Sequence, residues 1–250
     1  MTPSALAGLG LQPLSMRSVL LSTLLGSNPP RLRAAQLIAM ASVFGFSAAQ
    51  AESSLAVLAA TGDVTIENHR YRLGPRLARR QRRQDQTRTD PRLPWGGRWA
   101  MVVLDRGSED LENADELRRE LLGLQFALWR EGVWLRPDNL GLRHVPMLQQ
   151  HATTWVTDAP NNLDGRSLVA RLWDLNAWAG RAELLLEALP QALDLIDGLP
   201  VAIATIGHLT RDPLLPDGLS PKGWPSQTLR KEFARCATEI ETELALFLRR

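Results

Sequence analysis

Residues 47–73 read SAAQAESSLAVLAATGDVTIENHRYRL, and two local patterns in this segment predict the fold of the N-terminal part of the chain. Ser47 and Gln50 form the S-x-x-Q pattern of a capping box, which predicts a helix that ends near Gly62. Residues 64–73 then predict a two-stranded hairpin, because a β-prone run and an alternating run flank a polar turn. A helix followed directly by such a hairpin is typical of the second half of a winged helix.

Two further helices are predicted before this stretch. Leucines at helical spacing predict one over residues 14–25. Asn28 as N-cap, with Pro29 at the first helical position, predicts another that ends at Gly45. About three residues then join the second and third helices, which is helix-turn-helix spacing. Residues 31–51 also have the basic, apolar and small-residue order of a secretory signal, but they start about 30 residues into the chain, so we interpret them as helices.

Positive charge is concentrated in the same part of the chain. Only two of the 29 basic residues are lysines, and a GC-rich genome also produces such an arginine excess, so the excess alone indicates no partner. Residues 1–92, however, carry 12 arginines against five acidic residues. Six of these arginines lie within residues 76–88, directly after the predicted hairpin. Such a cluster is either a solvated linker or a phosphate-binding segment, and its position favours nucleic acid.

Beyond a proline-punctuated boundary at residues 90–94, the chain predicts a small α+β unit. Strands are expected over 99–104, 132–135 and 153–157, and a helix over 109–122. Strand, helix, strand and strand in this order favour a ferredoxin-like fold.

Apolar residues at helical spacing dominate the rest of the chain. They predict helices over residues 167–190, 191–208 and 226–248. We therefore expect an α+β protein of three parts: a winged helix-turn-helix DNA-binding domain with a basic linker (1–90), a central ferredoxin-like domain (91–165) and a helical C-terminal domain (166–250).

The residues that carry catalysis in common enzyme motifs are missing. No glycine-rich phosphate loop, H-E-x-x-H or G-x-S-x-G motif is present. The four histidines do not have metal-ligand spacing, so we expect no catalytic residue, metal or other cofactor. The single cysteine, Cys236, excludes an internal disulfide and fits a reducing cytosol. No apolar run reaches the roughly 18–20 residues of a membrane span, so a cytoplasmic protein without a membrane partner is expected.

Several segments together resemble the PaaX-type repressors, which regulate phenylacetic acid degradation. Residues 94–104, 117–126 and 131–137 follow the family's R-x-L-x-x-L-G-F…G-V-W-V-x-P order. Residues 171–175, RLWDL, are similar to its A-x-x-W-D-L signature. The most specific match is RDPLLP…LSP…WP over residues 211–225.

The resemblance implies a dimeric repressor of a catabolic operon that binds palindromic operator DNA. It implies a winged helix on the DNA, a central domain similar to a CRISPR adaptation nuclease, and a helical C-terminal domain. It also implies release by an acyl-coenzyme A effector, phenylacetyl-coenzyme A in the best-known members; the sequence assigns no effector-binding residue. The residues expected to contact DNA are Gln50, Ser53 and Ser54 on the third helix, Arg70 and Arg72 on the hairpin, and Arg79, Arg80, Arg82 and Arg83 beyond it.

The third helix departs from the family pattern because it carries no arginine. Arginine makes the commonest specific base contact, so Gln50, Ser53 and Ser54 would read sequence more weakly. One alternative is therefore an interaction protein that kept the fold and lost operator recognition. Another is a metal-dependent nuclease built on Asp105, although a two-metal site needs more carboxylates than this one.

Overall fold

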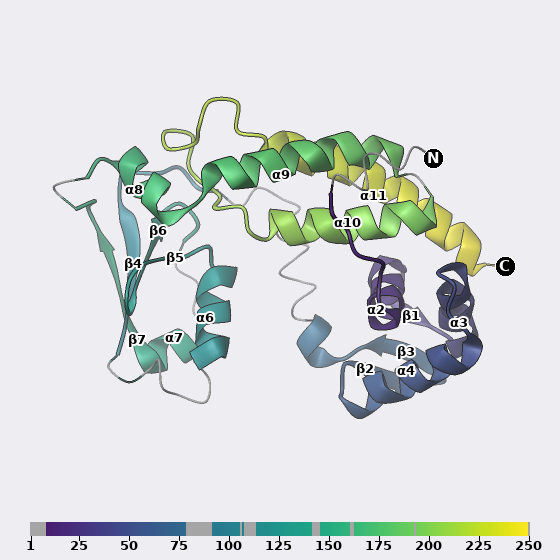
Figure 1. Ribbon diagram of the computed structural model, residues 1–250. Coiled ribbons are helices and arrows are strands. Elements are labelled where there is room, and N and C mark those ends of the chain that lie inside the picture. The colour runs from purple at the N-terminus through teal and green to yellow at the C-terminus, as the bar shows by residue number, and fades with distance from the viewer. Residues whose placement is uncertain are drawn as a thin grey trace. The chain divides into compact units, whose positions relative to one another are not determined.

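The structure is a computed structural model that describes residues 9–78, 92–105, 107, 114–141, 146–160, 163–192 and 194–249 (Figure 1). The chain forms two compact units. The first comprises Met1–Thr89, Arg181–Gly207 and Gln227–Arg250, and the second comprises Asp90–Gly180 and His208–Ser226. Each unit therefore combines segments that are distant in the sequence.

The first unit begins with the predicted winged helix. Its helices are α2 (Met16–Gly26), α3 (Ala34–Val43) and α4 (Ala48–Ala60). Its antiparallel sheet has the order β1-β3-β2, with β1 at Arg31–Leu32, β2 at Val64–Glu67 and β3 at Arg70–Leu73.

Two local predictions for the winged helix are confirmed. The Ser47 side chain accepts a hydrogen bond from the backbone N–H of Gln50, so the capping box starts α4 at the expected residue. Asn68 and His69 connect β2 and β3 with φ angles of 50° and 58°. A two-residue hairpin turn of type I′ needs positive φ at both positions, and its twist matches that of the flanking strands.

The predicted start of the second helix is wrong. Helix α3 begins at Ala34 instead of just after Asn28, because residues 31–32 pair with β3 as the short strand β1. Leu32 is buried in the core of the winged helix, opposite Tyr71. A two-residue strand has no periodicity to show in the sequence, and its pairing with a distant strand overrides the local helix signal of Pro29.

The core of the winged helix brings α2 against α4. Leu20 and Leu24 of α2 pack with Leu55 and Leu58 of α4, and all four are almost completely buried. Gly74 closes the base of the hairpin through a 2.7 Å hydrogen bond from its N–H to the carbonyl of Asp63. The backbone at Gly74 therefore lies very close to the backbone at Asp63.

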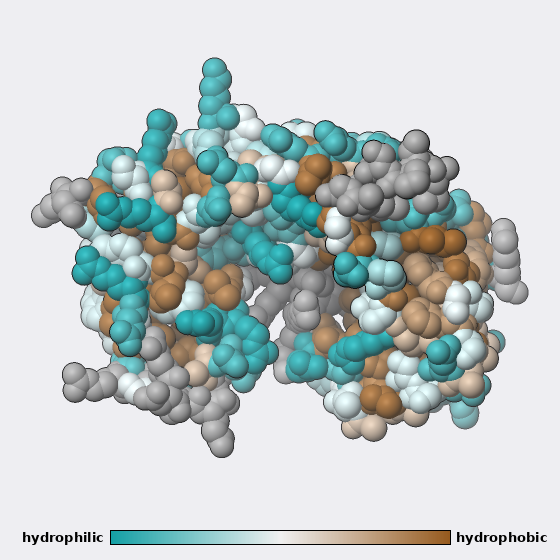
Figure 2. Space-filling model, viewed as in Figure 1, coloured by the Kyte–Doolittle hydropathy of each residue, from teal (hydrophilic) through white to brown (hydrophobic). Residues whose placement is uncertain are grey.

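Helices from the end of the chain complete the first unit. They are α10 (Leu195–Leu209) and α11 (Ser226–Leu248), with the second half of α9 (Leu175–Ala188) and the short 3-10 helix η2 (Leu189–Gln191). Leu244 of α11 packs on Val19 and Met40, and the Gln36 side chain donates a 2.9 Å hydrogen bond to the Leu248 carbonyl. In Figure 2 a hydrophobic, brown area lies over the C-terminal end of α11 and the neighbouring α3. The end of the chain is therefore tied to the winged helix.

The second unit contains the predicted ferredoxin-like fold. Its elements follow the order β4 (Trp99–Leu104), α6 (Ala114–Gly123), β5 (Ala127–Arg130), β6 (Val133–Pro137), α7 (Pro146–His151) and β7 (Ala152–Thr157). The antiparallel sheet has the order β5-β6-β4-β7. The sequence did not predict β5, which has only four residues and a register shift between Leu128 and Arg130.

The helix predicted over residues 167–190 is in fact two helices. They are α8 (Gly165–Leu172) and α9, separated at Trp173 and Asp174. The Asp174 side chain accepts a 2.9 Å hydrogen bond from the Ala177 N–H and so starts α9 separately. A capping aspartate inside an apolar pattern is a helix-start signal that the periodicity had hidden.

The most specific family-like string, residues 211–225, has a structural role in the second unit. Asp212 accepts hydrogen bonds from the Leu214 N–H, at 3.0 Å, and from the Ser226 hydroxyl. The Trp224 ring stacks on Trp178 at 4.6 Å between centroids, and Trp178 stacks on His208 at 4.3 Å.

Among the described residues, no helix is long and apolar enough to cross a membrane.

Candidate nucleic-acid interface

Helix α4 presents a small polar face to solvent. Gln50 and Ser53 are exposed, and Ser54 is half-buried. Together with Ala49 and two larger residues they line an open hollow of about 480 Å³. The structure therefore brings the three side chains predicted to read DNA onto one surface of α4.

The side chain of Gln50 already has a structural role. Its Oε1 accepts hydrogen bonds from the Ser47 N–H at 2.9 Å and from the Ser47 hydroxyl at 3.0 Å. Only its amide N–H groups remain to donate to a base edge while the helix cap is intact. The hydroxyls of Ser53 and Ser54, in contrast, have no hydrogen-bond partner within the described chain, so both are available to a ligand.

The sheet of the winged helix gathers three arginines on one face. Arg70 and Arg72 alternate with the core-facing Tyr71, so their side chains share the outer face of β3. Arg31 of β1 lies directly opposite Arg72 and therefore shares that face. Like charges in directly opposed positions repel one another, and a polyanion would relieve this repulsion. An ion pair with Glu67 partly neutralises Arg72.

Sequence reasoning missed Arg31 as a member of this group. The sequence pattern predicts Arg31 at the start of a helix, and only the pairing of β1 with β3 brings it next to Arg72. The basic character of residues 31–33 is the one signal for this surface in the sequence. It indicates the surface only when strand β1 is known to pair with β3.

The predicted cluster beyond the hairpin is only partly within the described residues. Arg79, Arg80, Arg82 and Arg83 lie outside them. Arg76, which was counted with that cluster, has its guanidinium 2.6 Å from Asp63 Oδ1. At least this arginine is therefore engaged inside the winged helix.

Asp63 holds the base of the hairpin by ion pairs. Its side chain is only 5% exposed, and its Oδ2 lies 2.6 Å from the guanidinium of Arg17 on α2. The Thr61 hydroxyl donates a further hydrogen bond of 3.0 Å. Hydrogen bonds from Arg17 and then from Arg76 hold the pKa of Asp63 well below its usual range, against the opposing effect of burial.

We expect Asp63→Asn to destabilise the winged helix by about 1–2 kcal/mol, because the charge-assisted bonds are lost while both arginines are exposed to solvent and screened. A carboxyl with a lowered folded pKa stabilises fully above its unfolded pKa and loses that contribution as pH falls through the folded value. The advantage of the wild type over the variant should therefore be full above about pH 5 and shrink below about pH 4. Urea unfolding of both proteins from pH 3 to pH 7 measures this, and a pH-independent difference would contradict it.

The surroundings of Asp105, on which the nuclease alternative depends, do not form a metal site within the described residues. Asp105 is exposed at the end of β4, and among the described residues no group of three or more His, Cys, Asp or Glu side chains is arranged to hold a metal.

Cys236 is fully buried in α11, and this burial raises the pKa of its thiol. A thiol with these properties is a poor nucleophile and packs as a small apolar side chain.

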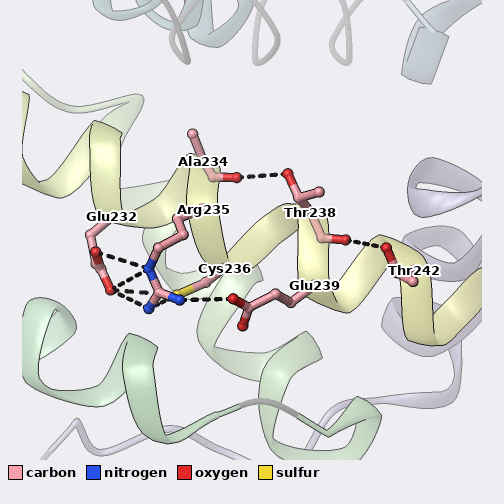
Figure 3. Close-up of polar contacts among 7 residues, drawn as sticks. All are labelled: Glu232, Ala234, Arg235, Cys236, Thr238, Glu239 and Thr242. Carbon is pink, nitrogen blue, oxygen red and sulfur yellow. Dashed lines mark hydrogen bonds and ion pairs between the residues drawn. The ribbon is translucent and has the colours of Figure 1, made fainter.

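The exposed face of α11 is unsuited to a polyanion. Figure 3 shows the Arg235 guanidinium held between Glu232 and Glu239, with N–O distances of 2.5 Å and 2.8 Å. Its positive charge is thus paired within the helix. The hydroxyls of Thr238 and Thr242 on this helix donate to the carbonyls one turn earlier.

The chain is similar to known proteins in two comparisons. Residues 92–161 match the family model described as the PaaX protein central Cas2-like domain. The solved structure of the uncharacterized protein Rv0674 from Mycobacterium tuberculosis is similar, with a TM-score of 0.74 and 32% sequence identity over 93% of this chain and 98% of that chain. No curated protein matches the sequence.

Proposed function

We propose that this chain, which belongs to the PaaX family of DNA-binding transcriptional regulators of phenylacetate catabolism, represses a catabolic operon by binding operator DNA. The observation that carries the proposal is the winged helix, in which an exposed polar face of α4 accompanies a sheet face with three arginines. The operon is one for the degradation of phenylacetate or a related aromatic acid.

The proposed complex is a homodimer on a palindromic operator. Two copies of α4 enter successive major grooves, about one helical turn apart. Ser53, Ser54 and the amide of Gln50 contact base edges. Arg70 and Arg72, with the predicted contacts Arg79, Arg80, Arg82 and Arg83, neutralise phosphates and set the register without reading sequence.

The division into winged-helix, central and C-terminal domains at residues 90 and 165 belongs to the same proposal.

An acyl-coenzyme A, such as phenylacetyl-coenzyme A, is the proposed effector. By linkage, it releases DNA only if it binds more tightly to the arrangement that does not bind the operator. A coupling of about 1–3 kcal/mol, or roughly 5–150-fold in affinity, is sufficient for induction.

A second candidate function is protein interaction without operator recognition. Two observations favour it: α4 has no arginine, and the Gln50 side chain caps its own helix. Such a protein would still bind DNA through its arginines, but with the same affinity for every sequence.

The deciding experiment is a polarisation assay on the region upstream of the chain's own gene, with a scrambled duplex as competitor. Preferential binding to the upstream duplex that phenylacetyl-coenzyme A releases supports the full proposal. Preferential binding without release keeps the repressor and removes this effector. Equal competition by the scrambled duplex would contradict operator recognition and favour the interaction protein.

A charge placed on α4 provides a matched test of the interface. Ser53→Asp brings a carboxylate towards the phosphates, and we expect it to weaken operator binding by about tenfold or more. Thr238→Asp adds the same charge to the exposed face of α11 and should leave affinity within about twofold, since a distant exposed charge is largely screened. Equal weakening by both variants would show that α4 does not face the DNA.

A further inference from the structure

A cavity of about 320 Å³ lies inside the first unit, between the winged helix and the two C-terminal helices. One wall is formed by α2, over residues 17–26, together with Leu73 at the end of β3. The other wall is formed by α10, from Leu199 to Ile206, and by α11, from Phe233 to Leu244. The cavity is thus bounded by the DNA-binding fold on one side and by the end of the chain on the other.

We propose that this cavity binds an amphipathic small molecule, and that its occupancy changes the affinity of the winged helix for DNA. The second part rests on the proposed function, whereas binding itself does not. The chemistry of the walls defines the class of ligand.

The lining of the cavity is mainly apolar. Twelve of its seventeen residues are leucine, isoleucine, alanine or phenylalanine, so most of the ligand must be apolar. The polar exceptions lie mostly on α2, where Arg17, Ser18 and Ser22 face the cavity, with Glu241 on α11. The Ser22 hydroxyl has no hydrogen-bond partner within the described residues and is therefore free to orient a polar group of the ligand.

The cavity is half-open to solvent, so its volume limits the size of the part of the ligand that is buried. A cavity of about 150 Å³ lined by apolar side chains holds one benzene molecule, so a cavity about twice as large accepts roughly 10–15 non-hydrogen atoms. A whole coenzyme A does not fit this space. Of an acyl-coenzyme A, only the acyl group would enter, with its polar end towards α2.

Occupancy of the cavity acts on a helix that also supports α4. The face of α2 away from the cavity contributes Leu20 and Leu24 to the core shared with α4. Arg17 lines the cavity and also forms the ion pair that holds Asp63 at the base of the hairpin. A ligand that displaces α2 therefore reaches both proposed DNA-contacting elements through a single layer of side chains.

Binding is measured on the full-length protein without DNA, with the fluorescent apolar probe 1-aminoanthracene. We expect saturable binding of one probe per chain. Ala202→Leu places a larger side chain in the cavity and should weaken binding by about tenfold or more. Ala204→Leu makes the same change on α10 at a half-buried position outside the lining, so it should bind as the wild type does.

A second variant changes the cavity in the opposite direction. Ile203→Ala enlarges it, so the n-alkanol that displaces the probe best should become longer than for the wild type. Circular dichroism shows whether Ala202→Leu folds. If it does not fold, the comparison of Ile203→Ala with the wild type still tests the ligand site. Absence of saturable probe binding, or equal loss in Ala202→Leu and Ala204→Leu, would overturn the ligand site.

The proposed effect of the bound ligand on DNA binding is measured separately, as the operator affinity with and without probe. Saturating probe should change operator affinity by about fivefold or more in the wild type and leave Ala202→Leu unchanged. Probe binding with unaltered operator affinity would overturn the regulatory coupling. Probe binding by a protein that does not prefer its operator would support the cavity as a ligand site and contradict the proposed function instead.

Discussion

Replacing Arg31, Arg70 and Arg72 together with alanine is expected to weaken operator binding by about 100-fold at physiological salt. The three guanidiniums share the outer face of the sheet, and each phosphate that an arginine neutralises releases condensed counterions. The slope of log affinity against log salt should fall by about 2.7, or about 0.9 for each lost contact. Titrations of the operator at several salt concentrations measure both quantities.

The matched control removes the same charge from the second unit. Arg118, Arg166 and Arg171 are all exposed there, and their replacement by alanine should leave the salt slope unchanged. If the two triple variants lose affinity equally, the effect is one of net charge and the sheet face is not an interface. The three single variants are measured as well. If Arg70→Ala and Arg72→Ala lower the salt slope but Arg31→Ala does not, Arg31 is not part of the DNA-binding surface.

Gly74→Ala is expected to have the largest effect on stability. A Cβ at this position would lie 2.0 Å from the Gly62 carbonyl oxygen and 3.0 Å from the Asp63 carbonyl oxygen. Both are backbone atoms, so the turn must open and the hydrogen bond from Gly74 to Asp63 must lengthen. We expect a loss of about 3 kcal/mol or more, which corresponds to a Tm lower by roughly 6–12 °C.

A second glycine in the same unit supplies the comparison. A Cβ on Gly207 of α10 meets nothing within 4 Å, so Gly207→Ala should raise stability slightly through the helix propensity of alanine. Differential scanning calorimetry of the two variants distinguishes close approach from a general effect of glycine. A Tm for Gly74→Ala within about 2 °C of the wild type would show that the turn relaxes at little cost.

The elements that the sequence predicted well are those that carry their own local signals. The capping box at Ser47 starts α4, and the turn at Asn68 and His69 joins β2 and β3. The last helix begins at Ser226 and ends at Leu248, as its apolar spacing predicted. Capping, turn geometry and helical periodicity all act over a few residues, so the sequence displays them directly.

The elements that the sequence missed depend on distant partners. Strand β1 has two residues and exists because Arg31 and Leu32 pair with β3. Strand β5 exists because it pairs with β6, with a shift in register after Leu128. Such short segments have too little pattern of their own, and their backbone groups adopt strand geometry to satisfy hydrogen bonds within a sheet.

The winged helix, the ferredoxin-like unit and the family resemblance can be predicted from the sequence alone, because capping residues, apolar periodicity and motif spacing are all local. The shared face of the arginines, the ion pairs of Asp63 with Arg17 and Arg76, and the half-open cavity between α2, α10 and α11 are visible only in the three-dimensional structure. These features depend on contacts between residues far apart in the chain. The free energy of such contacts comes from packing and burial, which no short stretch of sequence reveals.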